Sequence, residues 1–291
     1  MGMHFGHVAL QVRDLTSSAS LATSTLGLRE SLRDDRSAFL TANEKHHELQ
    51  LVGTGTAGLD HIGLEVEHRR DLDGLRDRVI AHGARILSER PEEPGLGEAL
   101  RCEGPGGVVF EVYVGMDREP LSIDTVLRPF ARKLGHVNLL SDEKPELEQF
   151  ILEVLDFRVS DRLGDVVTWM RCDTDHHGIA LAQASAGTRL HHYAWELESW
   201  SAMGRYADHV ACSGQKFIWG PGRHGPGFNN FTYLVDPDGV IVEAYCDLMR
   251  IYDEAAYRPI DWSTEPRALN LWGPLLPPDW GEHGVPALKP S

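Results

Sequence analysis

The seven residues GHVALQV, from Gly6 to Val12, set the pattern on which the rest of the chain is built. Apolar and polar side chains alternate along them, as is typical of a β-strand with one buried face. Asp14 can then cap a helix that runs to about Leu26, where Gly27 would end it. Short strand patterns follow. The segment therefore predicts one strand, one helix and then two or three strands.

The same order of elements restarts three more times. Strand patterns begin again near Asp60, Leu134 and Leu190, each followed by a helical pattern and by further strands. One unit takes roughly 55 residues, and self-similarity at such a period indicates a repeated supersecondary unit. We therefore predict an α+β fold of four βαβββ modules in two tandem domains.

The domain boundaries follow from the spacing of these units. We predict an N-terminal domain at 1–120, a polar linker at 121–133, a second domain at 134–250 and a tail at 251–291. The tail is rich in Trp and Pro and has no periodicity, so we expect it to be extended and to pack across the second domain.

Two histidines and one glutamate recur at the same places in both halves. The sets are His7, His61 and Glu111, spaced by 54 and 50 residues, and His136, His192 and Glu243, spaced by 56 and 51. A lone strand histidine is usually a packed core or surface residue, but this recurrence favours ligands. Two imidazoles and one carboxylate on one face of an octahedral ion form the ligand set of non-haem Fe(II) oxygenases.

The stretch WGPGRHGPGFNNFTYLVDPDGVIVE, from Trp219 to Glu243, carries one of these residues. Its Gly- and Pro-rich first half predicts a loop that presents His224. Two strands should follow, joined by the DPDG turn, with Tyr233 and Glu243 on the same face. A Glu at a solvent-facing strand position is the simple interpretation. Buried among apolar neighbours, however, it would need a cation.

Further polar groups gather in the second half. His177 lies 15 residues before His192, and His224 lies 32 residues after it. The first half offers His46 and His47 in a place similar to His177, but it has Glu92 and Arg101 where His224 and Tyr233 would fall. The first half therefore holds at most the ligands without the acid–base groups, and whether it binds metal is left open.

The second half resembles the catalytic half of the type I extradiol ring-cleavage dioxygenases, which belong to the vicinal oxygen chelate superfamily that includes the glyoxalases. The motifs that carry the resemblance are GHVN at 135–138, RLHH at 189–192, GRH at 222–224 and DPDG at 236–239, with Tyr233 and Glu243. It implies two tandem domains of that superfamily, with the metal site in the C-terminal one. It also implies cleavage of a catechol by O₂ at Fe(II), with Mn(II) as an alternative, to a muconic semialdehyde-type product of aromatic catabolism.

The resemblance assigns roles to individual residues. His136, His192 and Glu243 match the iron ligands, with His192 preferred to His191 because the second of the pair aligns. His177 matches an acid–base histidine, and His224 and Tyr233 match groups beside the substrate oxygens. Asn138 and Trp169 fall at pocket positions. The tail would partly cover the mouth of the site.

One position departs from the family's pattern. Members that bind a carboxylated catechol place an Arg five residues before the loop histidine, where this chain has Trp219. An apolar or aromatic substituent on the substrate is therefore expected. Two rival functions remain open: a non-redox metal enzyme that resembles glyoxalase or an epimerase, and a metal-free binding protein of the same superfamily.

The net charge of the chain limits which kinds of molecule it can bind. Lys and Arg number 28 against 44 Asp and Glu, a net charge of −16, which argues against nucleic acid and anionic membranes. The sequence has no apolar run long enough for a membrane span, and its N-terminus lacks the charged and apolar regions of a signal peptide. We therefore expect neither feature. The four cysteines are far apart, which favours reduced thiols in the cytoplasm. We expect a cytoplasmic homo-oligomer.

Overall fold

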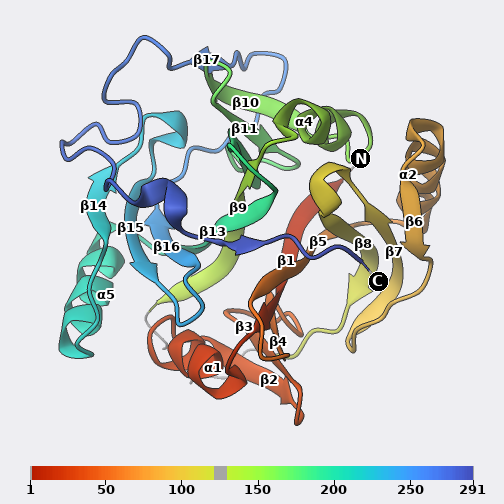
Figure 1. The fold of residues 1–291 in the computed structure, drawn as a ribbon, viewed down its shortest axis with the longest axis horizontal. Coiled ribbons are helices and arrows are strands. Elements are labelled where there is room, and N and C mark those ends of the chain that lie inside the picture. The colour runs from red at the N-terminus through yellow and green to blue at the C-terminus, as the bar shows by residue number, and fades with distance from the viewer. Residues whose placement is uncertain (1, 121–129, 291) are drawn as a thin grey trace.

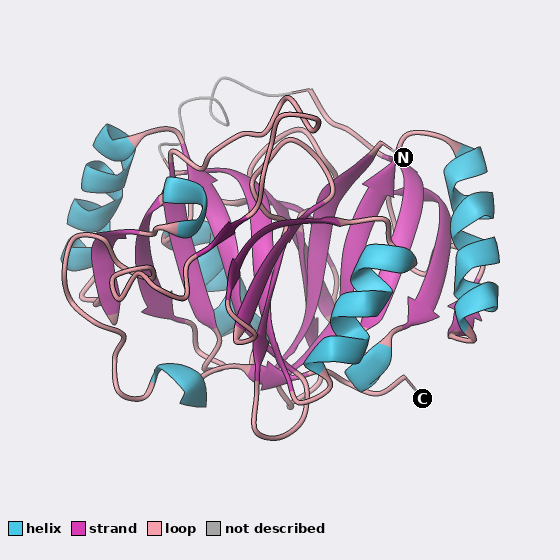
Figure 2. Ribbon diagram, turned by 90° about the horizontal axis from the view of Figure 1, so that it is seen from above, coloured by secondary structure: helices cyan, strands magenta, loops and turns pink. Residues whose placement is uncertain are grey.

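The computed structural model describes residues 2–120 and 130–290 and contains two β-sheets that lie side by side (Figure 1). The helices lie outside the strands, so the inner faces of the sheets are free to carry the sites (Figure 2). The first sheet and its helices comprise β1 (Met3–Val12), α1 (Leu15–Ser24), β2 (Arg29–Arg33), β3 (Ser37–Thr41), β4 (Leu49–Gly53), β5 (Gly58–Val66), α2 (Arg69–His82), β6 (Arg85–Ser88), β7 (Leu96–Glu103), η1 (Pro105–Gly107) and β8 (Val109–Met116).

The second sheet repeats this order and adds short elements from the tail. It comprises β9 (Ala131–Ser141), α4 (Lys144–Glu153), β10 (Arg158–Leu163), β11 (Val167–Arg171), β12 (Ile179–Gln183), β13 (Arg189–Leu197), α5 (Trp200–Cys212), β14 (Trp219–Arg223), η2 (Pro226–Phe228), β15 (Asn230–Val235) and β16 (Ile241–Cys246). The tail contributes β17 (Ile260–Asp261), η3 (Trp280–Glu282) and β18 (Val285–Pro286).

Each module is closed in the same way. Its first strand pairs in parallel with its last, as β1 with β4 and β13 with β16. The two modules of a domain then join through antiparallel pairing of their first strands, β1 with β5 and β9 with β13. The predicted α+β fold of four βαβββ modules in two tandem domains is confirmed.

Local signals explain where the helices begin and end. The Asp14 carboxylate accepts the backbone N–H of Ser17 at 2.7 Å, and Ser199 Oγ accepts that of Ala202 at 3.2 Å. These contacts satisfy backbone donors that the first turn of a helix leaves free. Gly83 ends α2 with a φ of 77°, a conformation that glycine adopts without strain.

The predicted loop at the start of the 219–243 stretch was wrong. Trp219–Arg223 forms β14, which pairs with β15 and lies at the edge of the sheet. An edge strand tolerates Pro because one side of its backbone has no neighbouring strand to bond. The register shifts between Trp219 and Gly222, which accommodates the Gly- and Pro-rich sequence. His224 comes directly after this strand.

Buried polar contacts join the two domains. Asp238, in the predicted DPDG turn, accepts the backbone N–H of Arg13 and the hydroxyl of Ser18, both at 3.0 Å. Glu48 of the first domain accepts the backbone N–H of Leu134 at 3.1 Å. Most of the predicted linker, 121–129, lies outside the described residues, and β9 already begins at Ala131.

The tail crosses the second domain and reaches the first. β18 pairs with β13, and the backbone N–H of Leu288 then donates to the carbonyl of Leu59 at 3.0 Å. The tail thus connects the central strands of both domains. Within 2–120 and 130–290, none of the helices has the length and apolar character that crossing a bilayer requires.

Candidate active site

The three predicted ligands of the C-terminal domain come from neighbouring strands. His136 lies on β9, His192 on β13 and Glu243 on β16. Ala194 of β13 stands opposite both His136 and Glu243, so the small residue between them lets the longer side chains meet over one face. All three ligands are buried.

The ligand atoms are spaced as a metal ion requires. His136 Nε2 lies 3.0 Å and His192 Nε2 lies 3.5 Å from Glu243 Oε2. Two atoms that each lie about 2.1 Å from one ion are separated by about 3.0–3.4 Å in octahedral or tetrahedral geometry. The residues therefore fit a divalent cation. Burial opposes ionisation of Glu243, but His136, His224 and Tyr233 together hold its pKa below the usual range.

A relay of hydrogen bonds fixes the tautomer of His192. The ring of His191 bonds the carbonyl of Trp280 through Nε2 at 2.8 Å, so Nε2 carries its proton. Burial lowers the pKa of His191 to about 4, so the ring is neutral and its Nδ1 is an acceptor. His192 Nδ1 lies 2.7 Å from that atom and must donate to it. The lone pair of His192 is thereby left on Nε2, the atom that faces Glu243.

His224 and Tyr233 form a second oriented pair. His224 Nδ1 lies 2.6 Å from the carbonyl of Leu269 and must donate to it. Burial lowers the pKa of His224, so Nε2 of the neutral ring accepts the Tyr233 hydroxyl at 2.8 Å. Burial also raises the pKa of Tyr233 well above its ordinary value. The pair therefore holds the Tyr233 oxygen in a fixed position, where it can accept a hydrogen bond from a hydroxyl group in the cavity.

His177 lies against the first ligand. Its ring centroid is 4.3 Å from that of His136, and its Nδ1 is 3.0 Å from Nδ1 of His176. Burial, together with the neighbouring His136 and His176, lowers the pKa of His177 well below its ordinary value. The neutral ring can therefore accept a proton and later return it.

All nine residues predicted for the site border one cavity of about 210 Å³. The structure brings Asn138, Trp169 and Trp219 to it along with the ligands and the acid–base groups. The tail was expected at the mouth of the site, but the sequence did not single out its residues Leu269 and Trp280 as part of the lining. A Trp in an aperiodic segment shows no periodic signal of its position, so only the expected packing of the tail could have indicated them.

The cavity is apolar away from the ligands. Trp219 stacks on Tyr233 with ring centroids 5.6 Å apart, and Trp280 packs edge-on against both rings. No Lys or Arg belongs to its lining among the described residues. Asn229, also missed by sequence reasoning, donates to Glu243 Oε1 at 3.1 Å and holds the carboxylate from outside.

Comparison with known families decides the superfamily. The profile of the "Glyoxalase/Bleomycin resistance protein/Dioxygenase superfamily" matches residues 4–112 and 133–244. The chain belongs to this superfamily. The first match covers nearly all of the first sheet and the second match covers most of the second sheet, so each domain matches the superfamily profile by itself.

Individual relatives are similar to this protein over nearly its whole length. The "Manganese-dependent 2,3-dihydroxybiphenyl 1,2-dioxygenase" of Geobacillus genomosp. 3 is 28% identical, over 94% of this chain and 95% of the relative. The Mn(II)-bound glyoxalase of Novosphingobium aromaticivorans is 28% identical with a TM-score of 0.87, over 98% and 95%. Homoprotocatechuate 2,3-dioxygenase of Brevibacterium fuscum, solved with 3,4-dihydroxyphenylacetate, is 25% identical with a TM-score of 0.90, over 98% and 93%.

Proposed function

We propose that this protein is an extradiol dioxygenase that cleaves the ring of a catechol with O₂, and that His136, His192 and Glu243 hold its metal ion. The observation that carries the proposal is the position of the three ligands at the inner wall of an apolar cavity that His177, His224 and Tyr233 also border. The names of the Geobacillus and Brevibacterium relatives support the same reaction class. The product is a ring-opened muconic semialdehyde-type compound.

Fe(II) or Mn(II) fits the two imidazoles and one carboxylate, and the bound ion supplies the positions and the electron transfer through which catechol and O₂ react. The relay through His191 keeps His192 Nε2 unprotonated for this purpose. Asn229 keeps Glu243 in place. The protein therefore presents its ligands already oriented, which limits the reorganisation that binding would otherwise need.

Proton transfer falls to the groups that border the cavity. A catechol must lose a proton when it binds a cation, and neutral His177 is an acceptor close to His136. The resulting imidazolium can return the proton to the leaving oxygen later in the reaction. Tyr233 donates its proton to His224, so the Tyr233 oxygen is left to accept a hydrogen bond from a hydroxyl group of the substrate, and the contact with His224 holds it in place.

The lining favours a catechol with an alkyl, aryl or fused-ring substituent. Trp169, Trp219 and Trp280 offer apolar surface, and burial of such surface contributes roughly 25 cal/mol per Å². A carboxylate arm would lose its hydration without gaining a Lys or Arg among the described lining residues.

The reaction is tested by loading metal-free protein anaerobically with Fe(II) or Mn(II), adding a panel of catechols and then admitting air. A yellow ring-fission product should appear only with metal and O₂, and it should disappear in the Glu243→Ala variant together with the ion of the C-terminal site. No product from any catechol with a fully loaded protein would contradict the proposal.

One observation favours a second candidate function, because one of the similar structures is described as a glyoxalase. Such a reaction isomerises its substrate without O₂. The same loaded protein should therefore be offered a hemithioacetal of methylglyoxal under argon. Turnover there, without ring cleavage in air, would favour the non-redox function.

We also propose that the protein is located in the cytoplasm and that it forms a homo-oligomer. The four cysteines are unpaired, which agrees with a reducing compartment. Trp272 is 53% exposed and Leu275 is 80% exposed, and an exposed apolar group of this kind is typical of a subunit contact. Light scattering after size exclusion should give a mass above that of one chain, and Leu275→Glu should lower it.

A further inference from the structure

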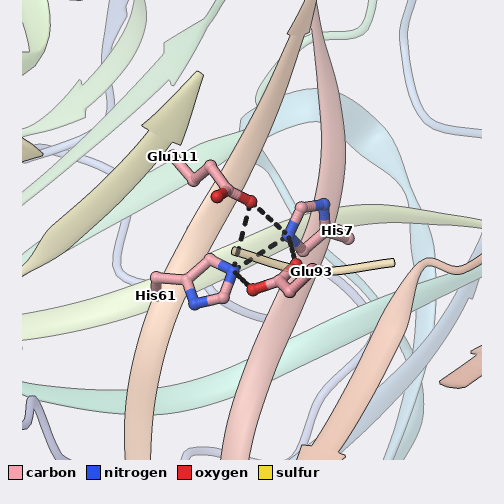
Figure 3. A group of neighbouring side chains, drawn as sticks. All are labelled: His7, His61, Glu93 and Glu111. Atoms are coloured by element: carbon pink, nitrogen blue, oxygen red, sulfur yellow. Dashed lines mark hydrogen bonds and ion pairs between the residues drawn. The ribbon is translucent and has the colours of Figure 1, made fainter. Parts of the chain in front are cut away.

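A second convergence of ligand-type side chains lies in the N-terminal domain (Figure 3). His7 on β1, His61 on β5 and Glu111 on β8 occupy the module positions that His136, His192 and Glu243 occupy in the other domain. Glu93, in the loop between β6 and β7, adds a fourth. Figure 3 shows the four side chains turned towards one another.

The ligand atoms of this cluster are as close together as those of the C-terminal site. His7 Nε2 lies 3.0 Å from His61 Nε2 and 3.3 Å from Glu93 Oε2. Glu111 Oε2 lies 3.6 Å from His7 Nε2 and 3.7 Å from His61 Nε2. These separations bracket the value of about 3.0–3.4 Å expected for atoms around one ion. The side chain of His7 lies over Gly63, where a Cβ would come within 2.1 Å of the ring.

Outer groups orient the cluster. The Asp60 carboxylate lies 2.8 Å from Nδ1 of His61 and holds that nitrogen outside the cluster, while Nε2 points inward and lies 2.8 Å from Glu93 Oε1. A metal ion would take the place of the proton between Nε2 and Glu93. Arg101 donates to Oε1 of Glu111 at 2.8 Å and also to Oε1 of Glu93. The other carboxylate oxygens, Oε2 of Glu93 and of Glu111, are buried inside the cluster without a hydrogen-bond donor. Burial of a carboxylate oxygen without a hydrogen bond is unfavourable, and a bound cation would relieve it.

The charged groups around the N-terminal cluster also favour a bound cation. The four carboxylates of Asp60, Glu92, Glu93 and Glu111 stand against one guanidinium, that of Arg101, so acidic groups exceed this basic group by three. A divalent ion would offset most of this excess. Burial of all four inner side chains makes such compensation more valuable than it would be at a surface.

We propose that the N-terminal domain binds a second divalent transition-metal ion through His7, His61, Glu93 and Glu111, and that this ion is structural. Arg101 stands opposite Glu111 as Tyr233 stands opposite Glu243, so a guanidinium fills the place that borders the substrate cavity in the other domain. Four protein ligands complete a mixed nitrogen and oxygen shell suited to Mn(II) or Zn(II). This assignment does not depend on the reaction at the C-terminal site.

The test is a metal count on the full chain. Chelator-treated protein is dialysed against Mn(II) alone or Zn(II) alone, and bound metal is measured by mass spectrometry. The wild-type chain should bind two ions. The His136→Ala/Glu243→Ala variant should keep one, and adding His61→Ala/Glu111→Gln should remove it. His68→Ala, an exposed histidine of the same domain, serves as the control and should leave the count unchanged.

A second readout keeps the proposal independent of the folding of any one variant. Chelation of the ion retained by the His136→Ala/Glu243→Ala variant should lower its melting temperature, because an ion bound only by the folded state stabilises that state. The proposal is overturned if the wild-type chain binds only one ion in the Mn(II) experiment and only one ion in the Zn(II) experiment. It is also overturned if the C-terminal variant binds none, or keeps its ion after His61→Ala/Glu111→Gln. Ring-cleavage assays play no part in these outcomes.

Discussion

His177 borders the cavity next to His136, and in the proposed reaction it is the residue that moves a proton. Replacing it with Phe keeps the ring volume but removes both nitrogens. We expect His177→Phe to bind metal and catechol, and to lower kcat by roughly two to four decades, the usual cost of losing a positioned acid–base group. Single-turnover kinetics should locate the loss after substrate binding.

The control for this variant is His68→Phe, which changes an exposed histidine far from the C-terminal ligands along the chain. It should turn over like the wild type. Turnover of His177→Phe equal to the wild type across the pH range would remove His177 from the mechanism.

His191 is predicted to act through His192, since its Nδ1 accepts the proton that fixes the ligand's tautomer. His191→Phe removes this acceptor, and we expect metal affinity to fall by roughly 10- to 100-fold, as for other partners of metal-bound histidines. His191→Asn retains an acceptor oxygen and should recover part of the affinity. Competition with a fluorescent chelator measures both. Equal affinity in the wild type and His191→Phe would mean that the relay has no effect.

The Glu148 carboxylate links helix α4 to strands β10 and β11. Glu148 accepts the ammonium of Lys144 at 2.9 Å and the hydroxyl of Thr168 at 2.8 Å, and it also pairs with Arg162. Partial burial opposes ionisation, but Arg162, Lys144 and Thr168 lower the pKa of Glu148 to about 2. The folded state therefore favours the ionised form more than the unfolded state does.

The sign of this shift fixes a pH dependence. The contribution of Glu148 is present above its unfolded pKa of 4.5 and is lost as pH falls towards about 2. Glu148→Gln should lower the free energy of unfolding by about 1–3 kcal/mol at pH 7. The deficit should shrink at pH 3. Urea denaturation at both pH values measures this, and Glu153→Gln, an exposed change on the same helix, should have little effect. A deficit that grows towards pH 3 would contradict the assignment.

Trp219 of strand β14 and Trp280 of the tail both pack against Tyr233, so we expect these two elements to set the substrate range. We expect kcat/KM to be higher for alkyl- or aryl-substituted catechols than for homoprotocatechuate. An added phenyl ring should contribute about 1–3 kcal/mol through burial. If the carboxylated catechol is preferred, an arginine must reach the substrate, and Arg223→Ala and Arg267→Ala would identify it.

At the scale of the whole molecule, the repeat made most of the architecture predictable. The four strand starts fixed the module order, and the recurrence of His7, His61 and Glu111 indicated where side chains would meet. Glu93 was not predicted because it lies in a loop without periodicity, where only tertiary folding brings it to the cluster. Trp280 escaped prediction for the same reason. The edge strand β14 was missed because Gly and Pro oppose strand formation locally and only its edge position tolerates them.

Isotope labelling is the most direct test of whether the C-terminal site inserts O₂ into a catechol ring. Protein loaded with Fe(II) or Mn(II) should be mixed with an alkyl- or aryl-substituted catechol under ¹⁸O₂, quenched rapidly and examined by mass spectrometry. We predict that both oxygen atoms of ¹⁸O₂ appear in the ring-opened product, and that Glu243→Ala forms none. A product that carries no ¹⁸O, or turnover that proceeds equally under argon, would contradict the account.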